Sequence, residues 1–175
     1  MFTSNMIKIK RFKLPWTDLR IEVKKARERL KIDESTLREV NISHWDEIEQ
    51  NIWKRFSTRK NSRWIWESLH PPYYSFYIEN YKLLNLTELI DQSETVWFLL
   101  DETVNEKTKF WIYEGLISSF DRVIWECYYI DEILIVSKKY KWLISINHHD
   151  YIIGTGIMSE KLKQLENKIN TASNN

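Results

Sequence analysis

The stretch from Tyr128 to Ile153 reads YYIDEILIVSKKYKWLISINHHDYII, and it decides the fold. It contains three apolar segments, residues 128–137, 140–147 and 150–153. The connections between them are only two residues long, Lys138-Lys139 and His148-His149. Connections this short join antiparallel neighbours, because parallel strands need a crossover of a dozen or more residues. The stretch therefore predicts three adjacent antiparallel strands.

Upstream of this stretch, the chain offers further extended segments. ETVWFLLD (residues 94–101) and TKFWIYEG (residues 108–115) are two apolar runs that suit the arms of a hairpin. YYSFYI (residues 73–78) follows Pro71-Pro72 and is rich in aromatic residues, which favour strands. The alternating residues 7–10 predict a short strand or an extended arm.

Helical patterns surround these segments. Between Trp16 and Leu30, apolar residues recur at steps of three and four, which predicts an amphipathic helix. A second helix is expected from Ser43, which suits the N-cap position. Residues 63–69 suggest a helical turn, and a last helix is expected from about Ser159. The order predicts one α+β domain over residues 1–170, with N-terminal helices, a mainly antiparallel sheet of about five strands, and a C-terminal helix. Residues 171–175 are expected to be a frayed tail.

The composition narrows the class of protein. The formal net charge is +1, which gives no general attraction to nucleic acid. No apolar run approaches the roughly 20 residues that a membrane span requires, so we expect no membrane association. Cys127 is the single cysteine, which fits a reducing, cytoplasmic setting. Abundant Ile, Lys and Asn with only two alanines suggest an AT-rich, bacterial genome.

His148, His149 and Asp150 are the first candidates for chemistry. A regular strand through residues 140–149 would place the two imidazoles on opposite faces, where they could not share a metal ion. The remaining potential ligands show no recognisable spacing, so neither a metal site nor a cofactor is predicted. His148 and Asp150 could share a face and act as an acid–base pair, which keeps a hydrolase using all three residues as an alternative. In the structural alternative, Asn147 or Asp150 forms the turn of a hairpin.

Tryptophans and basic residues form the second candidate. Trp64 and Trp66 lie just before the double proline and close to Arg55 and Arg63. Such residues could stack on single-stranded nucleic acid or anchor a protein interface. The neutral overall charge argues against nucleic acid. The predicted binding residues are Trp64, Trp66, Tyr73, Asn147, His148 and His149.

Two resemblances bear on function. The segment from Tyr128 to Gly156, with its IVSKK, WL, NHHD and IG-G elements, resembles the C-terminal signature of a family of small uncharacterised bacterial proteins. FWIYEG (residues 110–115) is similar to the strand and turn that precede it in that family. The order of elements is also similar to the SUKH superfamily, whose members often act as immunity proteins against secreted toxins. This second resemblance implies a cytosolic protein that masks a toxin domain.

These observations favour binding over catalysis. We expect a protein-binding module whose partner is a protein, and whose specific form is an immunity protein that neutralises a toxin. The hydrolase based on His148, His149 and Asp150 is the first alternative. Nucleic-acid binding is the second, and it requires the basic N-terminal helix and residues 55–63 to form one continuous patch.

Overall fold

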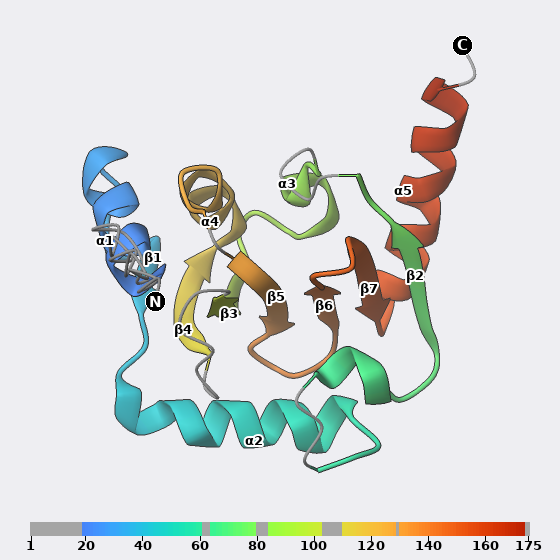
Figure 1. Cartoon of the computed structure of the whole chain (residues 1–175), viewed down its shortest axis with the longest axis horizontal. Helices are drawn as coiled ribbons and strands as arrows, with labels where there is room; N and C mark the ends of the chain where they lie inside the picture. Colours follow the sequence, from blue (N-terminus) through green and yellow to red (C-terminus); the bar gives the residue numbers. More distant parts are fainter. Residues whose placement is uncertain (1–18, 61–63, 80–83, 103–109, 129, 174–175) are drawn as a thin grey trace, which may run out of the picture.

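The computed structural model describes residues 19–60, 64–79, 84–102, 110–128 and 130–173. It contains a seven-stranded sheet in the order β1-β4-β3-β5-β6-β7-β2, and all neighbouring strands are antiparallel. Figure 1 shows this sheet between two layers of helices. The predicted α+β class and the antiparallel sheet are confirmed, but the sheet has seven strands rather than about five.

The strands follow the apolar segments closely. In chain order they are β1 Leu37–Glu39, β2 Tyr73–Tyr77, β3 Thr95–Glu102, β4 Trp111–Leu116, β5 Ile130–Ser137, β6 Leu143–Ile146 and β7 Tyr151–Thr155. β3 and β4 pair as the predicted hairpin arms, and β5, β6 and β7 are the predicted antiparallel neighbours. β1 was not predicted, because three residues are too few to show alternation. The strand or arm predicted at residues 7–10 lies outside the described residues.

The helices are α1 Leu19–Arg29, η1 Ile42–His44, α2 Trp45–Phe56, η2 Ile65–Ser68, α3 Leu86–Leu89, α4 Ile117–Ile124 and α5 Ile157–Ser173. The N-cap predicted at Ser43 is wrong, because a 3-10 turn precedes α2 and the Asn41 side chain caps that turn by accepting the Ser43 N–H. α5 continues to Ser173, into the range predicted as a tail. None of the helices in the described part of the chain is long and apolar enough to cross a membrane.

The sheet separates two hydrophobic cores, because successive strand residues point to opposite faces. α1, α3, α4 and α5 cover one face, called here the α5 face, where Phe98 of β3 stacks on Phe120 of α4. α2 and η2 cover the other, called here the α2 face, together with Leu99 of β3 and Leu134 of β5. Figure 1 shows the same division, with α2 below the sheet and α1, α3, α4 and α5 above it. Burial of both faces explains the near-continuous apolar runs of β3 and β5.

Glycines shape the junction between β7 and α5. Gly156 has a φ of +61°, in the left-handed region, and it turns the chain from the strand into the helix. Gly154 lies within β7, where a Cβ atom would stand 3.0 Å from the backbone oxygen of Met158 and 2.7 Å from Leu162 Cδ1. The missing side chain therefore lets the first turns of α5 pack directly on β7.

Candidate functional site

The turn between β6 and β7 is built by Asn147. Its buried side-chain oxygen accepts the backbone N–H groups of His149, at 3.1 Å, and of Tyr151, at 3.0 Å. The Asp150 N–H donates to the Asn147 carbonyl, and Asp150 adopts a left-handed φ of 60°. Asn and Asp favour such turns because their short side chains bond to nearby backbone and tolerate this conformation. Asn147, predicted as a binding residue, thus holds the turn in shape.

His148 and His149 lie side by side in this turn. Their ring centroids are 4.1 Å apart, with the ring planes at 45°. The predicted placement on opposite faces is wrong, because β6 ends at Ile146 and alternation stops there. Both residues are exposed overall, although the His148 side chain is only 30% exposed.

Trp64 and Trp66 of the η2 region pack against these imidazoles. Trp64 lies 5.2 Å from His148 between ring centroids, and Trp66 lies 6.0 Å from His148 and 5.6 Å from His149. Both indoles are half-buried, and Trp66 also borders the core of the α2 face. Four of the six predicted binding residues therefore form one group, called here the Trp–His cluster: Trp64, Trp66, His148 and His149.

A buried carboxyl group lies beneath the cluster. Glu132 of β5 is 2% exposed at its side chain, and its Oε1 atom lies 2.8 Å from His148 Nδ1. The Trp66 indole N–H donates to the same oxygen at 3.0 Å. Glu132 was not among the residues predicted from the sequence. The sequence does carry a sign of its burial. Glu132 lies two and four residues before Leu134 and Val136, so in a strand its side chain points to the same side as theirs, into the core of the α2 face.

The environment of Glu132 favours the protonated form of its carboxyl group. Burial raises the pKa of Glu132 from 4.5 to about 8, and the carboxylates of Asp131 and Asp101 act in the same direction. Hydrogen bonds from the Trp66 indole and the His148 backbone oppose this shift but do not cancel it. At neutral pH, the Glu132 carboxyl group is therefore mainly protonated and can donate to His148 Nδ1. An imidazole whose Nδ1 accepts this hydrogen bond carries its own hydrogen on Nε2, which is then a donor.

The remaining predicted residues lie apart from the cluster. Asp150 enters the turn through its backbone, and its carbonyl accepts the N–H of Ile78 at 2.7 Å. Tyr73 pairs with Thr155, at the end of β7 away from the histidine turn. The acid that accompanies His148 is thus Glu132 rather than Asp150.

Metal binding and a continuous basic patch find no support in the described residues. Over those residues, no group of three or more His, Cys, Asp or Glu side chains is arranged to hold a metal ion. The basic residues of α1 and those at the C-terminal end of α2 lie on opposite faces of the sheet (Figure 1), so within the described chain they do not form one patch.

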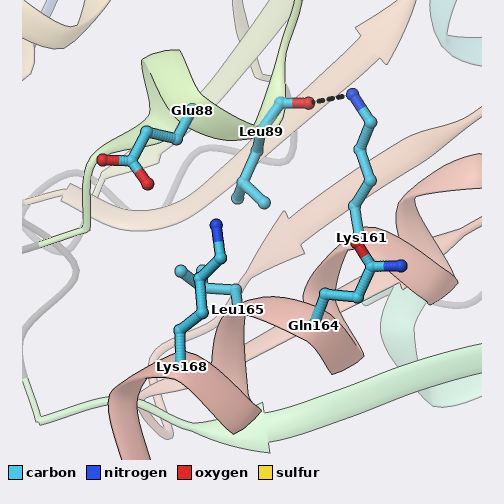
Figure 2. Close-up of a pocket in the computed structure, with 6 residues that line it drawn as sticks. All are labelled: Glu88, Leu89, Lys161, Gln164, Leu165 and Lys168. Carbon is cyan, nitrogen blue, oxygen red and sulfur yellow. Dashed lines mark hydrogen bonds between the residues drawn. The ribbon is translucent and has the colours of Figure 1, made fainter. Parts of the chain in front are cut away.

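A separate cavity of about 150 Å³ lies on the α5 face, between α3 and α5. Figure 2 shows Lys161 donating to the Leu89 carbonyl at 2.6 Å, with the Lys168 ammonium pointing toward the same residue. Its lining residues are Glu88, Leu89, Lys161, Gln164, Leu165 and Lys168. Pockets for drug-sized ligands usually hold about 300–1,000 Å³. This cavity is smaller, and no predicted site residue lines it.

The fold and the cluster define an α+β protein with an antiparallel sheet between two helical layers and a buried acid beneath exposed imidazoles. Residues 15–166 match the model of DUF6756, described as a family of unknown function, and the chain belongs to that family. The matched range includes both segments of the Trp–His cluster and Glu132. No curated protein and no solved structure matches the chain.

Proposed function

We propose that this chain is a protein-binding module whose partner docks on the Trp–His cluster. The observation that carries the proposal is the assembly of Trp64, Trp66, His148 and His149, from two distant segments, into one accessible group of rings. Tryptophans dominate the binding energy of many protein interfaces, because they bury a large area at low entropic cost.

The protonated carboxyl group of Glu132 supports binding more than catalysis. With Glu132 donating to His148 Nδ1, the ring hydrogen lies on Nε2, which can donate to a carbonyl or carboxylate of a partner. In this tautomer, Nε2 cannot accept a proton as a general base. We therefore expect the partner to place an acceptor group opposite His148.

In its more specific form, the proposal makes the partner a toxin domain that this chain neutralises in the bacterial cytoplasm. The order of N-terminal helices, antiparallel sheet and C-terminal helix supports this form, although architecture is a weaker argument than site chemistry. Toxin domains encoded beside the gene are the partners to test.

Truncation of the cluster should weaken partner binding strongly. We expect Trp64→Ala and His149→Ala to raise the Kd at least about 10-fold, since interface anchors contribute about 2 kcal/mol or more. Trp125→Ala is the matched control, because Trp125 is 48% exposed at the end of α4. Calorimetry with each purified, inactivated toxin domain measures the Kd, and co-expression with the active toxin measures protection of growth.

Two outcomes would contradict the proposal at different levels. Cluster variants that bind like the wild type would show that the partner uses another surface. Failure of the wild-type protein to bind or protect against any neighbouring toxin would remove the immunity role.

A second candidate function is acid–base hydrolysis, which the 2.8 Å contact between His148 and Glu132 favours. His148 would act as the general base, and Glu132, rather than Asp150, would orient it. Activity would then rise with pH as Glu132 loses its proton. Chromogenic ester and phosphoester substrates, assayed from neutral to alkaline pH with His148→Gln as the control, test this candidate. If the hydrolysis rate did not change with pH and were the same for the wild type and His148→Gln, this candidate function would be excluded.

A further inference from the structure

Among the described residues, the backbone groups along the outer edge of β2 form a regular set without hydrogen-bond partners. β2 is the last strand of the sheet and pairs only with β7 among the described strands. Asn147 N–H donates to the Tyr151 carbonyl, so Tyr151 points its backbone groups toward β6. In an antiparallel ladder this direction alternates, so Ile152 and Gly154 point toward β2.

The register then fixes which residues of β2 face outward. Phe76 pairs with Ile152 and Tyr74 with Gly154, so these two residues use their backbone groups within the sheet. The hydrogen bond from Ile78 N–H to the Asp150 carbonyl agrees with this assignment, because Ile78, like Phe76 and Tyr74, then points its backbone groups toward β7. The N–H and C=O groups of Tyr73, Ser75 and Tyr77 therefore point away from β7, where the described part of the chain offers them no partner.

This edge lacks the features that usually prevent strands from pairing between molecules. Residues 73–77, YYSFY, contain no charge and no proline, and the strand has no bulge against β7. Tyr73 is 50% exposed and Tyr77 is 59% exposed. Tyr77 also packs edge-on against Tyr151, at 5.8 Å between ring centroids, which extends the exposed aromatic surface onto β7.

The three residues whose backbone groups face outward form a palindrome, Tyr73, Ser75 and Tyr77, so the edge has the same residue order in either chain direction. A two-fold axis at Ser75 would pair Ser75 with its own copy and Tyr73 with Tyr77 of the second copy. Isologous contacts need a surface that complements itself in this way. Glu79 would then lie opposite Pro71 of the second copy, so no like charges meet.

We propose that β2 is a homodimerisation edge, at which two copies join their sheets through antiparallel pairing centred on Ser75. The contact would involve only the five residues of β2 from each copy. Tyr73 and Tyr77 are already about half-buried in each monomer, so pairing would cover little further surface. Because such small interfaces bind weakly, we expect a Kd of about 1–100 µM. This dimer does not depend on the function proposed for the Trp–His cluster.

A charged residue at position 75, on the proposed two-fold axis, tests whether the two β2 strands pair. In Ser75→Lys, two ammonium groups would face each other, whereas Ser75→Val keeps an uncharged strand-forming residue there. We expect sedimentation velocity over about 1–500 µM, a range that brackets the expected Kd, to show a dimer for the wild type and Ser75→Val but a monomer for Ser75→Lys. Far-ultraviolet circular dichroism checks that all three proteins fold. A wild type that stays monomeric, or a Ser75→Lys variant that still dimerises, overturns the proposal.

A disulfide trap tests the register separately. Ser75→Cys should form a covalent dimer on mild oxidation, because paired Cα atoms about 5.5 Å apart suit a disulfide. Tyr73→Cys should not, since four residues of strand would separate the two sulfurs by about 13 Å. The wild type controls for Cys127, which is buried. A dimer that Ser75→Cys fails to link uses another surface, and that result also overturns the proposal.

Discussion

The wild-type protein should lose about 2–4 kcal/mol of its free energy of unfolding as the pH rises from about 5 to about 9, because each unit of pKa shift corresponds to about 1.4 kcal/mol. Burial raises the pKa of Glu132 to about 8 in the folded state, against 4.5 for an ordinary glutamate. The folded protein therefore binds a proton that the unfolded chain releases. This contribution is fully present below pH 4.5 and is lost as the pH rises through 8.

Glu132→Gln isolates this effect, since glutamine has nearly the same shape and no charge to bury. Urea denaturation at several pH values gives the free energy of unfolding for each protein. As the pH rises, we expect the free energy of unfolding of Glu132→Gln to increase relative to that of the wild type. Glu79→Gln, at an exposed position, is the control and should follow the wild type. Parallel curves for Glu132→Gln and wild type would show that Glu132 does not hold the proton.

Gly154→Val should destabilise the protein by about 3 kcal/mol or leave it unable to fold, because overpacking a buried junction forces the backbone to move. A Cβ atom at this position would already stand 3.0 Å from the backbone of Met158. Valine adds two more methyl groups, which would push α5 away from β7 and open the core that Leu162 fills.

The matched control for this change is Tyr151→Val in the same strand, where the side chain is 42% exposed. We expect that substitution to cost less than about 1 kcal/mol, as surface changes usually do. Urea midpoints followed by tryptophan fluorescence compare the two variants. A Gly154→Val protein as stable as the control would mean that α5 can shift without loss of packing.

The apolar runs predicted the fold well because they were long and the turns between them short. The segments around β5, β6 and β7 are apolar runs of strand length, and the short connections between them favour antiparallel pairing. β1 lacked that length. Sequence spacing also could not show that β1 and β2 flank the sheet, because both pair with strands far along the chain, as Tyr73 does with Thr155.

The candidate site was predicted in part. The sequence showed the aromatic character of Trp64, Trp66, His148 and His149. It could not show that they meet, because that depends on where β6 ends, and the Asn147 side chain holds the turn that follows. Glu132 was missed because the adjacent acids Asp131 and Glu132, at the start of an apolar run, resemble surface positions. Only the pairing of β5 and the packing of η2 show that it is enclosed.

The strand order also constrains how the chain folds during synthesis. The two outer strands, β1 and β2, are the first made, whereas the five inner strands follow in the C-terminal part. A nascent chain that has just completed β2 has no sheet to join, and its aromatic residues must wait for β7, some 75 residues later. Contacts at this separation form slowly and expose apolar segments in the meantime. The segments that form β1 and β2 are therefore the parts of the sheet that stay longest without their strand partners during synthesis.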